Sequence, residues 1–350
     1  MNKIKEKVLA NERISPQEAL QLVNFSIHEL GELAFKKRKS FHQKKTYYIY
    51  NQHLNYTNIC KNKCKFCAYF KEKNQKGAYT FSIADIKKEI KKRIHEPIVE
   101  IHIVGGLNPD LPLSYYEEML STIKNIRPDV RIKAFTAVEI AFLAEKHNLS
   151  EKDILLKLKN AGLDALPGGG AEVFSTSLRQ KLCPEKISAE KWLKIHELAH
   201  NLNIPTNCTL LFGHIETWPE RLDHLHSLRT LQDKTKGFLC FIPLPYQPNN
   251  NQLSAKGPNG QDFLQMIAIS RIFLDNIKHI KAYWAFSGLK AAQLALWFGA
   301  DDFDGTIVEE KIGHAAGADS PKGLTQAELK TYIQQAGFTP VQRNTFFQEI

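Results

Sequence analysis

Short apolar runs alternate with amphipathic stretches along most of the chain. The runs have the length of buried strands, and the stretches between them repeat apolar residues at helical spacing. Eight alternating units predict an α/β fold of the TIM type, a (β/α)8 barrel. A doubly wound open sheet shows the same alternation and stays open as the alternative. The eight expected strands lie at 47–51, 98–104, 130–135, 163–166, 206–212, 238–242, 280–285 and 302–307.

The predicted barrel spans residues 45–310 and has an extension at each end. Within residues 1–44, one helix begins with a capping box from Ser15 to Glu18 and keeps helical apolar spacing as far as Leu33. Residues 311–350 contain a helix capped at Thr325 and a last extended piece, and we expect this extension to pack on the barrel. The Pro/Asn/Gly-rich loop at 243–260 is long enough to suggest a function.

Composition narrows the class of protein further. The 350 residues are 43% hydrophobic and 24% charged, which is ordinary globular usage, and no stretch approaches the ~20 apolar residues of a membrane span. We therefore expect a cytoplasmic protein without a membrane partner. The net charge of +10 is spread over helix faces such as 86–96, which argues against a nucleic-acid partner. Six cysteines in such a chain favour metal or redox chemistry over disulfides.

Half of those cysteines lie within eight positions. Cys60, Cys64 and Cys67 follow the first expected strand in a C-x3-C-x2-C pattern, at the face where barrel active sites are built. Three thiolates can hold three irons of a [4Fe–4S] cluster and leave the fourth iron open to another ligand. A zinc site completed by His53 or another histidine is the alternative, although no second ligand pair is visible.

Two glycine-rich stretches follow expected strands on the same face. Gly105 and Gly106 permit close approach of the backbone to a ligand and could present amides to a carboxylate; an ordinary turn explains them equally well. After the fourth strand, three glycines precede Glu172 and Arg179, which could contact the ribose, ammonium or carboxylate of a nucleoside ligand. A flexible loop with solvated charges is the alternative there.

A rival enzyme class comes from residues 196–200, "HELAH". H-E-x-x-H on a helix can hold zinc and supply a general base. The extended form of this motif fails at Asn203 and Thr206, and a third ligand would have to come from Glu216 or Glu220. The helix is expected outside the barrel, where amphipathic packing explains the same residues.

The cysteine pattern with Phe66 before its third cysteine resembles that of the radical S-adenosylmethionine enzymes. The likeness extends in order over residues 45–345 to the aminofutalosine synthase family, which acts in menaquinone biosynthesis by the futalosine route. The dehypoxanthinylfutalosine cyclases are similar and form the alternative. The segments that carry the likeness are "HIVGGLNPDLPLSYYEEML", "IKAFTAVEI", "LPGGGAEVF", "TLLFGHIET", "FIPLPYQPNN" and "DFDGTIVEEKIGHAAGA".

This resemblance implies a reaction and its cofactors. Cys60, Cys64 and Cys67 would bind the [4Fe–4S] cluster, Phe66 would pack near S-adenosylmethionine, and Glu172 and Arg179 would contact its polar groups. The 5′-deoxyadenosyl radical would add to 3-[(1-carboxyvinyl)oxy]benzoate and give 6-amino-6-deoxyfutalosine, methionine and bicarbonate. An electron donor such as flavodoxin or ferredoxin would be the protein partner. Candidates for polar contacts with the substrate are Glu139, Asn207, His214 and Arg343.

Overall fold

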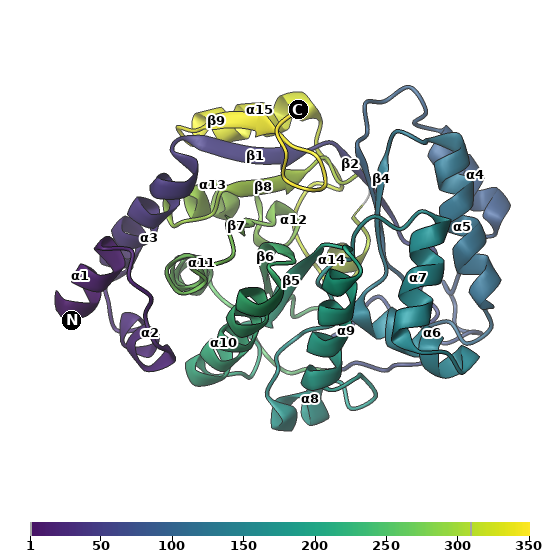
Figure 1. The fold of residues 1–350 in the computed structure, drawn as a ribbon, viewed down its shortest axis with the longest axis horizontal. Helices are drawn as coiled ribbons and strands as arrows, with labels where there is room; N and C mark the ends of the chain where they lie inside the picture. The colour runs from purple at the N-terminus through teal and green to yellow at the C-terminus, as the bar shows by residue number, and fades with distance from the viewer. Residues whose placement is uncertain (1, 309) are drawn as a thin grey trace.

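Eight parallel strand segments close into a barrel in the computed structural model, which describes residues 2–308 and 310–350 (Figure 1). The first barrel strand is interrupted at Tyr50. Its first half, β1, pairs with β8, and its second half, β2, pairs with β3. This pairing of first and last strands confirms the predicted barrel and excludes the open sheet. The strands are β1 Lys45–Ile49, β2 Asn51–Leu54, β3 Glu100–Ile103, β4 Arg131–Ala134, β5 Thr206–Phe212, β6 Phe238–Pro245, β7 His279–Ile280 and β8 Asp302–Gly305.

One barrel position is filled by a segment too short to be a regular strand. Ala165 bridges to Lys133 of β4, and Leu166 bridges to Thr206 of β5. Three predicted strand ends were wrong by three residues or more. The first strand continues as β2 to Leu54, β6 continues to Pro245, and the seventh strand ends at Ile280 because a short helix begins at Trp284.

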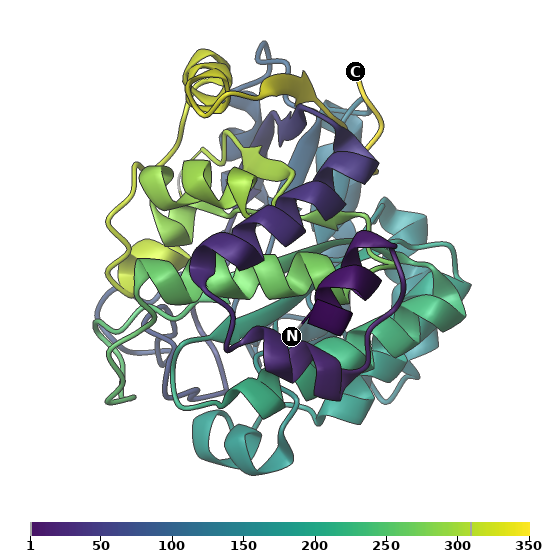
Figure 2. The same ribbon diagram turned by 90° about the vertical axis from the view of Figure 1, so that its left-hand side faces the viewer.

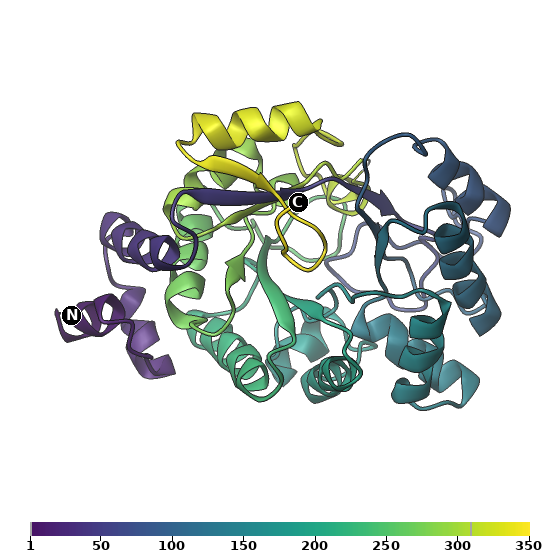
Figure 3. The same ribbon diagram turned by 45° about the horizontal axis from the view of Figure 1, so that its top comes forward.

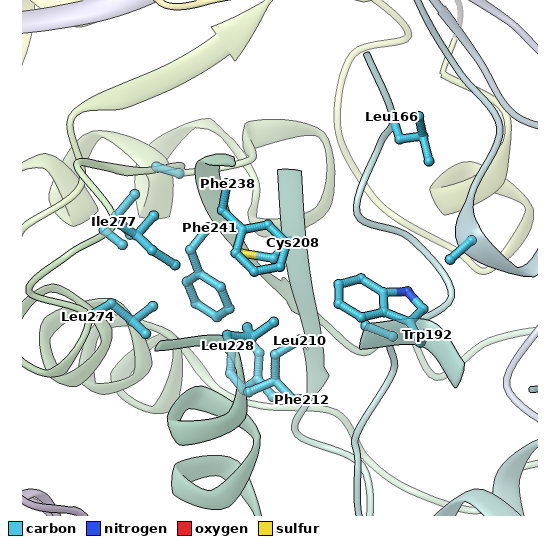
Figure 4. Close-up of a cluster of buried hydrophobic side chains, with 14 of the residues drawn as sticks. Leu166, Trp192, Cys208, Leu210, Phe212, Leu228, Phe238, Phe241, Leu274 and Ile277 are labelled. Carbon is cyan, nitrogen blue, oxygen red and sulfur yellow. The ribbon is translucent and has the colours of Figure 1, made fainter. Parts of the chain in front are cut away.

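Helices cover the outside of the barrel. The strand β5 shows why: all seven of its residues are buried, but alternate side chains meet different surroundings. Cys208, Leu210 and Phe212 point away from the barrel axis and pack with apolar residues of the flanking helices (Figure 4). The covering helices are α4 Ile83–Lys91, α5 Leu113–Ile126, α6 Ala137–His147, α7 Glu151–Ala161, α8 Thr176–Leu182, α9 Ala189–Asn201, α10 Trp218–Thr235, α11 Gly260–Phe273, α12 Trp284–Ser287 and α13 Leu289–Trp297.

The N-terminal extension contains three helices, so the single predicted helix was wrong. They are α1 Asn2–Leu9, α2 Pro16–Leu22 and α3 Ile27–His42. A second capping box, formed by Ser26 and Glu29, starts a new helix where the apolar pattern had suggested continuity. Figure 2 shows α3 lying across α11 on the side of the barrel. In the described part of the chain, no helix has both the length and the apolarity needed to cross a membrane.

The C-terminal residues join the barrel wall. After α14 Ile312–Ala315 and α15 Gln326–Gln335, the strand β9 Thr339–Gln342 runs parallel to β1 (Figure 3). Arg343 continues this pairing, because its amide donates to the carbonyl of Tyr48. Thr325 caps α15 as predicted. The boundaries of the three expected parts, at 44/45 and 310/311, stay predictions.

Candidate active site

The three clustered cysteines line one cavity at the carboxyl ends of the strands. The cavity has a volume of about 330 Å³, and its walls include Cys60, Cys64 and Cys67 together with both glycine-rich stretches. The cysteines lie on the loop between β2 and α4. That loop is held by backbone hydrogen bonds, from Cys67 to the carbonyl of Cys64 and from Cys60 to that of Lys71.

Their chemistry fits an iron–sulfur cluster better than zinc. Burial raises the pKa of the Cys64 thiol to about 12 and also raises that of Cys67, so a bound cation is needed to hold both as thiolates. Around one tetrahedral zinc, ligand sulfurs lie about 3.8 Å apart. Among the described residues, the three sulfurs form no group within 4.8 Å, alone or with His53. A cluster suits wider spacing because each sulfur binds a different iron.

The other three cysteines do not complete this set. Cys183, Cys208 and Cys240 are buried, free of disulfides, and absent from the cavity wall. Cys208 and Cys240 lie within β5 and β6, where they act as small apolar side chains. Of the six cysteines, then, only three face the cavity.

Gly105 and Gly106 bring the end of β3 against the cysteine loop. A Cβ atom on Gly106 would lie 2.2 Å from the carbonyl oxygen of Ile59, and one on Gly105 would lie 2.5 Å from the ring of Tyr56. Their amides are already used: Gly105 donates to Glu139 Oε1 at 3.3 Å, and Gly106 donates to the carbonyl of Thr57 at 2.9 Å. The expectation that these amides face a ligand carboxylate is therefore corrected, although both residues line the cavity.

The second glycine-rich stretch places an ion pair beside the cysteines. Glu172 Oε1 lies 2.5 Å from Lys186 Nζ, and both residues line the cavity. Lys186 Nζ also lies 5.1 Å from the centre of the Phe66 ring, which faces the same space. Lys186 was not among the predicted site residues, because it lies in the loop between α8 and α9 and no motif marks it.

Arg179 does not reach this cavity. Its Nη1 atom donates to the carbonyls of Ala171 and Val173, and its Nη2 donates to that of Ile187. These bonds fix the backbone on both sides of Glu172, and Arg179 is 5% exposed. The expected direct contact between Arg179 and a cofactor is corrected by this arrangement.

The four candidates for substrate contact separate into two pairs. Glu139 and Asn207 line the cavity, whereas His214 and Arg343 do not. His214 is bound to Glu216 at 2.9 Å and to the carbonyl of Leu211 at 3.0 Å, and its side chain has no exposed area. Arg343 pairs with Asp302 at the other end of the barrel. Both expectations are corrected, because each side chain is already satisfied elsewhere.

Glu139 is held in a buried network beside the cysteine loop. It accepts hydrogen bonds from Tyr56 at 2.9 Å and from the Thr136 amide at 2.7 Å, and it closes the capping box of α6. Burial outweighs these bonds and raises its pKa to about 7. Its carboxyl group can therefore gain or lose a proton near neutral pH.

The H-E-x-x-H match on α9 is a packing arrangement. His196 and His200 both bond the hydroxyl of Thr206, at 2.8 and 2.9 Å, and Glu197 pairs with Lys234. Within the described residues, neither histidine belongs to a three-ligand group suited to a metal. The helix lies outside the barrel, as expected, and the zinc hydrolase alternative is not supported.

The loop after β6 closes over the cysteine side of the cavity. Tyr246 and Gln247 line the cavity, and the Gln252 amide donates to the carbonyl of Lys65 between two cysteines. Asn249 donates to the carbonyl of Ala316 next to α14. This loop thus connects the cysteine segment to the C-terminal part of the chain.

Comparison with known proteins points to the same chemistry. Residues 54–228 match the radical SAM superfamily, and residues 235–349 match the CofH/MqnC C-terminal region. The chain is 42% identical to the aminodeoxyfutalosine synthase of Thermus thermophilus, over 99% of this chain and 95% of that protein. It is 35% identical to the cyclic dehypoxanthine futalosine synthase of Streptomyces coelicolor, over 99% of this chain and 88% of that protein.

The fold also matches a solved structure. The crystal structure of methylornithine synthase (PylB) superposes with a TM-score of 0.76 at 16% identity, over 96% of this chain and 97% of that chain. At this identity the match supports the barrel fold alone. It agrees with the closed barrel described above.

Proposed function

The chain belongs to the radical SAM superfamily, and we propose that within it the chain acts as an aminodeoxyfutalosine synthase. The observation that carries this proposal is a cavity with three free cysteines at the barrel mouth, in a chain 42% identical to such a synthase over nearly its full length. When bound, the [4Fe–4S] cluster and S-adenosylmethionine supply a 5′-deoxyadenosyl radical for addition to the double bond of 3-[(1-carboxyvinyl)oxy]benzoate.

The chain's own residues have separate tasks in this proposal. Cys60, Cys64 and Cys67 hold the cluster, and the Glu172–Lys186 pair offers one anion and one cation to the polar groups of S-adenosylmethionine. Phe66 packs beside that pair. Glu172 and Lys186 neutralise each other in the free protein. When a ligand with an ammonium and a carboxylate enters, Glu172 can bind the ammonium and Lys186 the carboxylate.

The cavity wall also protects a reactive carbon centre. Val104, Leu211, Ile242 and Leu244 give the middle of the cavity an apolar lining without exchangeable protons. The loop at 246–259 covers the cysteine side. An apolar lining with a loop folded over it would hold two reactants together and limit the access of water to them.

The proposed function also implies a location in the cell and an electron donor for the cluster. All six cysteines are free thiols, which suits the reducing conditions of the cytoplasm. The cluster must carry one electron to form each radical, and we propose that a small redox protein such as a flavodoxin or a ferredoxin delivers it. Loss of the carboxylate as CO2, which water converts to bicarbonate, releases one proton and one electron, and we propose that this electron returns to the cluster. Bicarbonate and methionine leave with 6-amino-6-deoxyfutalosine as the other products.

Labelling separates this function from its nearest alternative. With the cluster reconstituted without oxygen, S-adenosylmethionine labelled in its adenine should pass label into 6-amino-6-deoxyfutalosine, and free 5′-deoxyadenosine should be a minor product. A cyclase would instead release 5′-deoxyadenosine in proportion to turnover of dehypoxanthine futalosine. That result, with no labelled adduct from the enol ether, would contradict the proposal.

A further inference from the structure

The interior of the barrel below the cysteines is unusually polar. Barrel interiors are normally filled by branched apolar side chains. Here Asn51, His53, Glu100, His102 and Lys133 face the lower part of the same cavity. Burying polar groups costs free energy unless partners compensate it, so such a set needs a reason.

Three ion pairs account for the charged residues of this region. Lys133 Nζ lies 2.7 Å from Glu100 Oε2, and both side chains are 2% exposed. Lys281 pairs with Asp304, and Arg343 pairs with Asp302. Three cations thus balance three anions, and the carboxylates have their partners.

Three neutral residues are left without hydrogen-bonding partners within the described part of the chain, whereas the Asn51 side chain accepts a hydrogen bond from the Ile307 amide at 2.9 Å. In the described ranges, no hydrogen bond involves the imidazole of His53 or His102 or the side-chain amide of Asn207. Asn207 is 3% exposed, and its Oδ1 atom is buried without a partner. All three residues line the cavity. They are therefore available to a bound molecule.

These groups are aligned by strand register. His53 of β2 is paired with His102 of β3, and His102 is paired with Lys133 of β4. The two imidazole rings stack with centres 4.7 Å apart. Three neighbouring strands thus present polar side chains in one row, at one height inside the barrel.

The row offers more donors than acceptors. Burial lowers the pKa of both histidines, so each neutral ring offers one N–H donor. The Lys133 ammonium has three donors and one carboxylate partner. The Asn207 amide can turn its NH2 group toward a ligand. A ligand with an anionic, planar acceptor group matches this set.

The space between this row and the cysteine loop is long enough for one substituted aromatic ring. His102 precedes Gly106 by four residues, so at about 3.3 Å per extended residue the two lie at most roughly 13 Å apart. Gly106 lies against the cysteine loop. The space between has the apolar lining described above, which suits an aromatic ring.

We propose that His53, His102 and Asn207, with the ammonium of Lys133, form the subsite that binds the aryl carboxylate of the substrate. This inference rests on the proposed function. The benzoate end enters the barrel first, and the enol ether then points toward the cysteines. The subsite fixes the orientation of the substrate, and its members are positioning residues.

Binding measurements on the reconstituted protein without reductant test this, because no turnover occurs. The probes are 3-[(1-carboxyvinyl)oxy]benzoate and two analogues, with either the aryl or the vinyl carboxylate replaced by a carboxamide. We expect the aryl carboxamide to bind wild-type protein about 10- to 100-fold more weakly than the substrate. In His102→Phe, substrate affinity should fall about 10-fold. The ratio between the affinities for the substrate and for the aryl carboxamide should shrink to below about 3-fold. The vinyl carboxamide should lose the same factor in both proteins.

Controls separate the subsite from general damage. His102→Gln keeps an N–H donor and should retain most of the discrimination, and His226→Phe, on the exposed face of α10, should match wild type. Iron content and S-adenosylmethionine affinity should be unchanged in all three. If His102→Phe does not fold, Asn207→Asp serves instead: its added negative charge should weaken the substrate at least 10-fold and spare the aryl carboxamide.

The outcomes distinguish the two proposals. A variant that keeps the full aryl discrimination, or that loses the vinyl discrimination instead, overturns the subsite while the synthase assignment stands. Wild-type protein with a full cluster that binds none of the three probes overturns the proposed function and the subsite together.

Discussion

Replacing Gly106 with alanine tests how closely the cysteine loop depends on the end of β3. The added Cβ would lie 2.2 Å from the carbonyl oxygen of Ile59 and 3.0 Å from Cys60 Cβ. Ordinary contact begins at 3.4 Å, so the loop must move by about 1.2 Å, the difference of the two distances. Backbone atoms cannot rotate away as a flexible side chain does, and the shift therefore reaches Cys60.

We expect Gly106→Ala to lower the free energy of unfolding by about 1–3 kcal/mol, as overpacking does. Displacing one cluster ligand should also reduce the iron retained after anaerobic reconstitution by more than half. Iron and sulfide analysis and urea unfolding give the two numbers. The matched control is Gly260→Ala at the start of α11, where a Cβ meets nothing within 4 Å. Wild-type iron content and adenosyl transfer in Gly106→Ala would refute this reasoning.

Three further predictions concern ionisable side chains, two of them buried and one near the surface. Folding raises the pKa of Glu139 from 4.5 to about 7, so between these pH values the folded state binds more protons than the unfolded state. The free energy of unfolding should therefore fall by about 3 kcal/mol as the pH rises from about 4.5 to 7. Glu139→Gln should flatten this pH dependence in urea unfolding. Arg343→Met leaves buried Asp302 with only Lys281, which lies 3.7 Å away and also pairs with Asp304, and should cost about 3 kcal/mol in the same assay. Lys45→Met, which breaks an exposed pair, should cost under about 1 kcal/mol. Glu197→Gln should leave product formation unchanged, which a zinc hydrolase with this residue as base would not tolerate.

Most of the fold could be predicted from the periodicity of apolar residues, because strands and capped helices are marked by local sequence features. The eight strand positions follow from apolar runs, and the capping boxes at Ser15 and Thr325 mark helix starts that the structure confirms. The break at Ser26 was missed because the apolar spacing continues across it. The ends of β6 and β7 depend on pairing with neighbours, which no local pattern encodes.

Residue type alone could not decide the site beyond the cysteines. Arg179 and His214 lie near the barrel mouth in sequence, but carbonyl oxygens and Glu216 occupy their polar atoms. Lys186 enters the site only because the chain folds back to Glu172. For His102 a signal existed: polar and apolar residues alternate in β3, which in a barrel places the polar side chains inside. In β2 the polar residues Asn51, Gln52 and His53 follow one another, so no such alternation marks His53.

The C-terminal segment from Thr339 onward contributes to the end of the barrel opposite the cysteines. Arg343 lies directly after β9, is 1% exposed, and pairs with Asp302 of β8 inside the barrel. Its charge also acts on Glu100, the partner of Lys133. Without Arg343, Asp302 and Glu100 would compete for the cations beneath the proposed carboxylate subsite, and an incoming anion would meet excess negative charge. The segment that pairs with β1 therefore also contributes a cation to the charge balance beneath the proposed carboxylate subsite.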